Sequence, residues 1–171
     1  NPYDEFYNTV EKINEELRVR EKLERKYDRI LKARKTTAEE LKKITLDQIA
    51  SLRKENDLQQ QIANGRLSQI KNLGSETYVG EDGKTKTFSQ LGVTKYASYN
   101  ASTGTLSIDW NGLEKIKDTE FGEAVEAYIT KLQNYAESYE EAIDTIETNT
   151  DEIVEIQERS AENYLELEER V

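Results

Sequence analysis

Three residue types with reactive or metal-binding side chains are missing from this sequence of 171 residues, which contains no Cys, no His and no Met. Without Cys or His the chain cannot build a thiolate nucleophile, a serine triad with an imidazole base, or a zinc site of the usual nitrogen and sulfur ligands. We therefore predict a protein that is not an enzyme, with no catalytic residues, no metal site and no cofactor. The start at Asn1 rather than Met leads us to expect an excerpt from a longer parent chain, and removal of the initiator Met is the alternative.

Pro, Gly and long apolar runs are scarce as well. The chain has one Pro and eight Gly, and its 35% charged residues equal its 35% hydrophobic residues, with a mean hydropathy of -0.88. Such a composition has too little apolar material for a round core, but it suits long helices with narrow apolar seams. No stretch approaches the roughly 18 apolar residues that a membrane-spanning helix needs, so we expect no membrane span.

The charge of the chain is negative overall and unevenly distributed. A net charge of -11 argues against nucleic acid as the main partner, because phosphate binding needs concentrated Lys and Arg. Residues 1–72 hold 16 basic against 13 acidic residues, whereas residues 118–171 hold 3 against 17. This opposition predicts that the two segments face each other.

Residues 1–72 are predicted to form a long helix. Apolar residues recur at alternating steps of four and three, and the pattern slips in phase near Arg20: Phe6, Val10, Ile13 and Leu17, then Leu23, Tyr27 and Ile30. Two overlapping capping boxes, Thr36 with Glu39 and Thr37 with Glu40, would allow the helix to end and restart at 36–37. A continuous helix is the equal alternative.

Residues 73–117 change in character and predict a small β insert. The Asp82-Gly83 pair favours a tight hairpin between Thr77–Val79 and Thr85–Phe88, and a second hairpin is expected to turn at 100–104. Two short hairpins are marginal on their own, so Trp110 is expected to anchor them, at least half buried, against the helix ends.

Residues 118–171 show a heptad repeat that runs to the last residue, which is typical of a coiled-coil helix capped at Asp118 or Thr119. Polar Asn149, Ser160 and Asn163 interrupt the seam, and such residues often set the register or the number of partners. A third line of apolar residues beside the seam predicts that three or more helices pack together.

The fold class that follows is mostly α, a long antiparallel coiled-coil hairpin with the β insert at its turn, together one elongated module. Equal rise per residue from the two ends of the insert would pair positions whose numbers sum to about 190. Residues 18–35 would then lie antiparallel to about 155–172, with basic side chains facing acidic ones.

Several segments carry a family resemblance: Leu91–Tyr96 (LGVTKY), Gly104–Trp110 (GTLSIDW), and Phe121–Glu123 (FGE) with Tyr128 and Ile129. The sequence of these segments resembles that of bacteriophage tail tape-measure or other large virion structural proteins, from phages of gut bacteria. The resemblance implies a very long, helical, multi-copy protein of the virion, made in the bacterial cytoplasm, that helps to set tail length. The chain departs from a typical tape measure in lacking membrane-like apolar stretches and internal repeats.

The sequence is compatible with two functions. The leading hypothesis is a virion structural module in which the helical hairpin acts as a spacer, with other protein chains as partners, either as a homo-oligomer or as the rest of the parent chain. The alternative is a coiled-coil arm that presents the β insert as a protein-binding tip, through Tyr96, Tyr99 and Trp110, in another elongated or cell-envelope protein.

A metal-independent fold is the first testable expectation. We predict helix-dominated circular dichroism with a minor β component that a metal chelator leaves unchanged, because the chain lacks the ligands of a structural zinc site. Loss of helical signal after chelation would contradict this.

Overall fold

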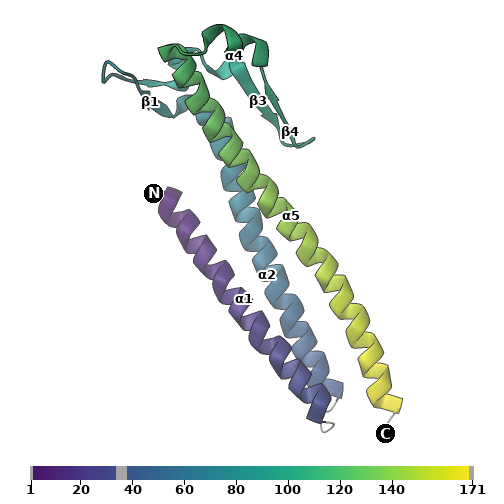
Figure 1. The fold of residues 1–171 in the computed structure, drawn as a ribbon. Coiled ribbons are helices and arrows are strands. Elements are labelled where there is room, and N and C mark those ends of the chain that lie inside the picture. Colours follow the sequence, from purple (N-terminus) through teal and green to yellow (C-terminus); the bar gives the residue numbers. More distant parts are fainter. Residues whose placement is uncertain (1, 34–37, 170–171) are drawn as a thin grey trace. The chain divides into compact units, whose positions relative to one another are not determined.

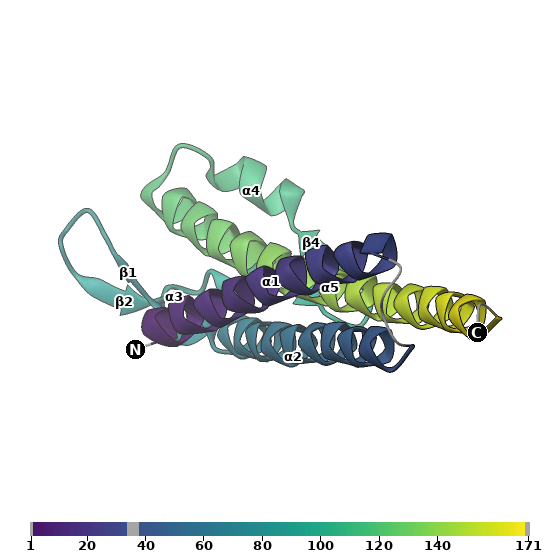
Figure 2. The same cartoon turned by 90° about the horizontal axis from the view of Figure 1, so that it is seen from below.

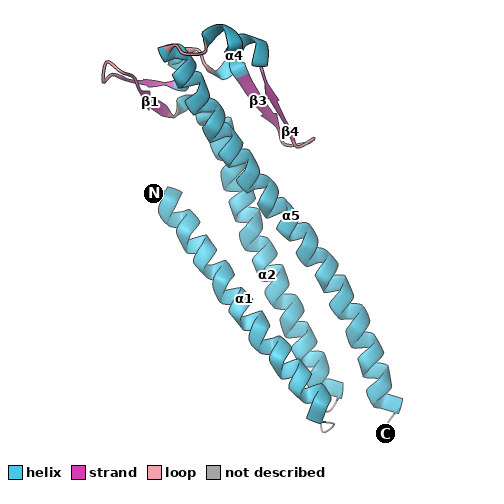
Figure 3. Ribbon diagram, viewed as in Figure 1, coloured by secondary structure: helices cyan, strands magenta, loops and turns pink. Residues whose placement is uncertain are grey.

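The computed structural model describes residues 2–33 and 38–169, most of which lie in helices (Figure 3). Three helices are long: α1 (Pro2–Ala33), α2 (Ala38–Lys71) and α5 (Glu120–Glu169). Short elements join α2 to α5: η1 (Leu73–Ser75), β1 (Thr77–Val79), β2 (Thr85–Thr87), α3 (Phe88–Leu91), η2 (Thr94–Tyr96), β3 (Ala97–Asn100), β4 (Thr105–Ile108) and α4 (Trp110–Ile116). The prediction of a mostly α protein with two small hairpins is confirmed.

The N-terminal half of the chain forms two helices rather than one. Helix α1 ends at Ala33 and α2 begins at Ala38, while the expected break at 36–37 lies outside the described residues. The chain as a whole divides into two compact units: unit 1 comprises the residues up to Ile62 and those from Ala142 onward, and unit 2 comprises Ala63–Glu141.

Unit 1 is built from α1 and the adjoining parts of α2 and α5. Figures 1 and 2 both show α1 alongside α2, and Figure 1 shows α1 running in the same direction as α5. Two buried apolar clusters hold these helices together: Tyr27, Leu41 and Ile44 with Leu23 and Ile30 beside them, and Ile49, Leu52, Ile153 and Ile156. Three helices therefore pack together in unit 1, as the width of the apolar stripe predicted.

The expected antiparallel pairing of residues 18–35 with the end of α5 is wrong. Because α1 folds back along α2, it runs parallel to α5 instead (Figure 1). The buried face of α1 differs in part from the predicted stripe. Ile13 and Tyr27 are buried as predicted, but Leu17 is exposed and Glu16 is buried instead. Between the two apolar runs, Glu16 and Arg20 occupy the positions of the buried face. Because these residues are polar, the apolar pattern alone shows a phase slip near Arg20.

The register of α2 against α5 also differs from the prediction. The amide of Asn149 pairs with that of Asn56 in unit 1, where the predicted register would have placed Asn134 opposite Asn56. The shift is about four helical turns. Its reason lies in unit 2, where the first turns of α5 form the wall on which the β insert packs.

The β insert of unit 2 contains two separate antiparallel hairpins. In the first, Thr77 pairs with Thr87, and the turn holds Gly83 at a positive φ of 76° that favours glycine. In the second, Ala97 pairs with Ile108. Both hairpins were predicted from their turn residues, and both are confirmed.

The core of unit 2 lies between this insert and one face of α5. Phe88 is 1% exposed and meets the ring of Tyr128 edge-on, with 5.4 Å between ring centroids. The remaining buried members are Leu73, Val93, Tyr96, Ala97, Ala124, Val125, Ile129 and Leu132. Trp110, the expected anchor, is instead 69% exposed, because Leu73, Phe88 and Val93 fill the buried space against α5.

Helix α5 begins at a tight corner. The backbone N–H of Gly122 donates to Oγ1 of Thr119 over 2.9 Å, so Thr119, one of the two predicted caps, satisfies one of the free N–H groups of the first turn. A Cβ on Gly122 would lie 2.2 Å from the carbonyl oxygen of Ile116. The corner therefore requires glycine at this position.

Which aromatic residue anchors the insert can be tested by replacing Phe88 and Trp110 separately with Ala. Phe88→Ala should lower the free energy of unfolding by about 3–5 kcal/mol, since it leaves a cavity in a closed core. Trp110→Ala, the matched control, should change it by no more than about 0.5 kcal/mol, as an exposed side chain does. Urea unfolding followed by circular dichroism measures both, and an equal loss in the two variants would show that Trp110 anchors the insert after all.

Candidate functional site

A polar layer between α1 and α2 interrupts the apolar packing of unit 1. The guanidinium of Arg20 forms a short ion pair with Glu55, and both side chains are largely buried. One turn away, Glu16 accepts a hydrogen bond from Ser51 Oγ at 2.7 Å and pairs with Lys54 Nζ at 2.7 Å. Buried ionic groups are tolerated when they are paired in this way, and they disfavour any register that separates them.

The charge of Glu16 is stabilised by its partners. Burial by itself raises the pKa of this carboxyl, but the hydrogen bonds from Lys54 and Ser51 and the positive charges of Lys54 and Arg20 outweigh burial and lower the pKa below its ordinary value of 4.5. In return, Glu16 raises the pKa of Lys54. The pair is therefore fully ionised near neutral pH and ties α1 to α2.

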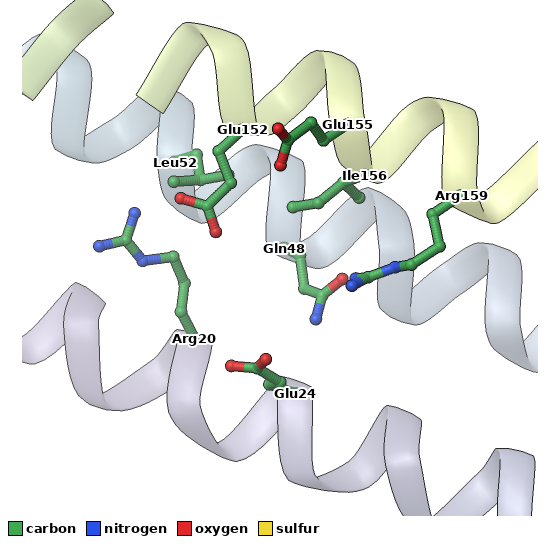
Figure 4. A pocket seen from close by; sticks show the side chains of 8 residues that line it. All are labelled: Arg20, Glu24, Gln48, Leu52, Glu152, Glu155, Ile156 and Arg159. Carbon is green, nitrogen blue, oxygen red and sulfur yellow. The ribbon is translucent and has the colours of Figure 1, made fainter. Parts of the chain in front are cut away.

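A cleft of about 250 Å³ lies beside this layer, where all three helices of unit 1 meet (Figure 4). Figure 4 shows the side chains that line it: Arg20 and Glu24 from α1, Gln48 and Leu52 from α2, and Glu152, Glu155, Ile156 and Arg159 from α5. Three carboxylates and two guanidinium groups nearly balance one another there. The cleft suits water or a small polar solute, and the residues that the structure describes contain no group of three or more acidic side chains placed to hold a metal ion.

The polar residues predicted to set the register lie in unit 1, where two of them have partners. Asn149, which is 6% exposed, donates from Nδ2 to Oδ1 of Asn56 on α2 over 3.0 Å. Asn163 donates from Nδ2 to the hydroxyl of Tyr27 on α1 in a short hydrogen bond. The guanidinium of Arg159 lies 5.3 Å from the centre of the Tyr27 ring. Ser160, the third predicted register residue, is half-buried. The seam of α5 is thus matched to two different helices.

The three residues of the predicted binding tip lie in unit 2 but differ in exposure. Tyr96 is buried, with its ring edge-on to Phe121, so its inclusion in an exposed tip was wrong. Tyr99 is half-buried and donates its hydroxyl hydrogen to Glu140 over 2.9 Å; burial first, and then this carboxylate, raises the pKa of Tyr99 to about 12. Only Trp110 presents most of its surface to solvent.

A second groove, of about 280 Å³, lies in unit 2 between the β1–β2 hairpin and the start of α5. Its apolar lining comes from Tyr78, Leu91, Phe121 and Ala124, and its charges come from Asp82, Lys84, Lys86 and Glu120. The backbone N–H of Glu81 donates to Glu120 over 3.1 Å, so the acidic side chain already serves the hairpin. This hydrogen bond therefore ties the β1–β2 hairpin to the first turn of α5.

The polar layer was missed by sequence reasoning, although a signal for it existed. Glu16 and Arg20 continue the three-and-four spacing of Ile13, Leu23 and Tyr27, so they stand on the same helix face. Charged residues at such positions are buried only when a neighbouring helix supplies opposite charges. The sequence of α1 does not reveal which helix does so.

Comparison with protein-family models, with curated proteins and with solved structures found no match to this chain. Among the helices of the described residues, none is long and apolar enough to cross a membrane.

The ionisation of Glu16 predicts how stability depends on pH. Because the pKa is lowered in the folded state, the stabilisation is present above about pH 4.5 and is lost as pH falls through the folded-state pKa. Glu16→Gln should therefore be less stable than the wild type near neutral pH, and this gap should narrow below about pH 4.5. The exposed Glu21→Gln serves as control, with a small gap at every pH. Urea unfolding across this range measures the gaps, and a Glu16→Gln gap independent of pH would refute the assignment.

Proposed function

We propose that this chain is a structural assembly module in which α2 and α5 pair as a long antiparallel coiled-coil hairpin and act as a helical spacer. The observation that carries the proposal is the hydrogen bond between Asn56 and Asn149 in the seam. A polar pair at such a position weakens packing but disfavours every register that would separate the two amides. A slip by one heptad would change the reach of a spacer by about 10 Å, so a spacer depends on a single register.

Other features of unit 1 support the same role. Arg20 with Glu55 and Asn163 with Tyr27 add polar matches on two further helix pairs, and each match is lost if a helix slides. Helix α5 continues for 50 residues, which corresponds to about 75 Å of rise. Long helices matched at several levels suit a protein that must keep a constant length.

The setting that we propose is a bacteriophage virion, in a tape-measure-like protein of the tail. It rests on the resemblance of three sequence segments given above and on the long helices, which such proteins require. The partners would be other protein chains, either further copies or the rest of the parent chain, rather than nucleic acid. The protein would be made in the bacterial cytoplasm and incorporated into the particle.

The spacer role can be tested through the register. In the double variant Asn56→Leu/Asn149→Leu, the seam should stay helical but lose its unique register, because apolar residues pack in several heptad positions. Since the chain has no native Cys, spin labels on Asp57→Cys and Thr150→Cys can report the distance by electron paramagnetic resonance. The labelled chain with Asn56 and Asn149 intact should show one narrow distance between the labels. The labelled double variant should show a second population displaced by about 10 Å.

The control for this measurement is Asn134→Leu, an exposed position on α5 that should leave the single distance unchanged. An unchanged single distance in the double variant would show that apolar packing alone sets the register, and it would remove the main support for the spacer.

The virion setting has a separate test. In purified phage particles whose genome encodes this chain, mass spectrometry should detect its peptides through a density gradient. Deleting the coding region should alter tail length or prevent tail assembly, as seen by electron microscopy. Recovery of the peptides from the host cell envelope but not from particles would refute the setting and favour the cell-envelope alternative.

A second candidate function is favoured by Trp110, which is 69% exposed at the start of α4. A large exposed aromatic side chain on a small, well-packed insert is typical of a protein-docking tip. As the only Trp of the chain, it reports its own environment. Docking of a virion or envelope protein should shift its fluorescence to shorter wavelength, and Trp110→Ala should weaken that binding about tenfold or more. Equal binding by Trp110→Ala would exclude the tip.

A further inference from the structure

Two solvent-facing stripes in unit 1 each gather charges of one sign, and exposed acidic residues such as Glu21 and Asp28 flank the basic stripe. The basic stripe on α1 comprises Arg18, Lys22, Arg25, Arg29 and Lys32. The acidic stripe on α5 comprises Asp144, Glu147, Asp151, Glu155, Glu158 and Glu162. All of these side chains are exposed, and successive members of each stripe are three or four residues apart, so each stripe follows one face of its helix.

Both stripes lie on the side of their helix opposite the buried residues, and one member of the acidic stripe, Glu155, also lines the edge of the cleft. On α1 the buried residues Ile13, Glu16 and Tyr27 lie on one face, and at 3.6 residues per turn the basic stripe lies on the opposite face. On α5 the buried residues Asn149 and Ile153 stand in the same relation to the acidic stripe. The stripes are therefore available to another molecule.

The two stripes are not neutralised within the part of the chain that the structure describes. The ion pairs of unit 1 join Arg20 to Glu55 and Lys54 to Glu16, and none of these four residues belongs to a stripe. Some opposite charges of the two halves meet, since Arg20 shares the cleft with Glu152 and Glu155, but the other members of the two stripes lie on outer surfaces. Such single-sign surfaces attract a partner of the opposite sign.

We propose that the basic stripe on α1 of one copy docks on the acidic stripe on α5 of a second copy. The two stripes are complementary in sign and in spacing, and they extend over similar lengths of about 21 Å and about 27 Å. A second copy explains both stripes at once, whereas a polyanion such as nucleic acid would use only the basic one. The net charge of -11 also disfavours a free polyanion.

The contact is heterologous, because one surface of each copy meets a different surface of the next. Every pairing leaves one basic and one acidic stripe free, so the contact closes into a ring or continues as an array. Exposed ion pairs are individually weak and screened by salt. In a multi-copy particle, high effective concentration would strengthen the contact, although its existence does not depend on the spacer role.

Charge reversal provides the test. In the α1-reversed chain, Lys22→Glu, Arg25→Glu and Arg29→Glu make the basic stripe acidic. In the α5-reversed chain, Glu147→Lys, Asp151→Lys and Glu158→Lys make the acidic stripe basic. Each variant alone should lose self-association, whereas an equimolar mixture of the two should regain it, since the reversed stripes complement each other. Sedimentation velocity measures association, and circular dichroism confirms that both variants are folded.

The expected results are specific to the proposed surfaces. The wild type should associate at about 0.01 M salt, where the screening length is about 30 Å, and dissociate at about 1 M, where it is about 3 Å. The α1-reversed chain should associate at least tenfold more weakly at low salt. The control reverses three exposed basic residues of α2, Lys42→Glu, Lys43→Glu and Arg53→Glu, and changes the net charge equally. It should associate more strongly than the α1-reversed chain.

Three outcomes would overturn the proposal. The first is a wild type that stays monomeric at low salt, and the second is an equimolar mixture that does not associate. The third is binding of a short DNA duplex through the basic stripe without self-association. The spacer role stands apart from all three, because the register measurement on Asn56 and Asn149 leaves both stripes intact.

Discussion

Polar side chains buried between the helices of unit 1 constrain its packing more than its apolar residues do. Glu16, Glu55 and Asn149 are each more than nine-tenths buried, and each meets a partner on another helix. An apolar seam tolerates sliding by a heptad, whereas a buried carboxylate or amide that loses its partner costs several kcal/mol for a charge and about 1–3 kcal/mol for a neutral group. The fold-back of α1 follows from this requirement, because α2 supplies Ser51, Lys54 and Glu55 at the right levels.

Helix α5 serves two different structural roles along its length. Its first turns offer Val125, Tyr128 and Leu132 to the β insert, and its later turns offer Asn149, Ile153 and Ile156 to the other helices of unit 1. The heptad pattern is the same in both parts, since a coiled-coil seam and a flat packing face use the same spacing. This shared use constrains the register of α2 against α5, because the first turns of α5 pack mainly against the insert.

The polar groups of the chain divide into two classes with different consequences. Those inside the bundle that have partners, such as Glu16, Glu55 and Asn149, specify how the chain packs on itself. Those on the outer faces of α1 and α5 form the two stripes of opposite sign, and they offer a surface that repeats from copy to copy. Together with the exposed Trp110 of the insert, these features support the proposal of a protein that assembles with others.

The local structure of this protein was determined by its sequence alone. The heptads of α5, the cap at Thr119, the two hairpins and their turns depend on residues close together in the chain, so periodicity and turn chemistry predicted them. The tertiary structure alone decided the fold-back of α1, the register of α2 on α5, and the burial of Phe88 in place of Trp110. Periodicity shows which face of a helix is apolar, but not which neighbour covers it. That choice depends on which buried polar groups find partners across the chain, and on which aromatic ring fits the space that the packed elements leave.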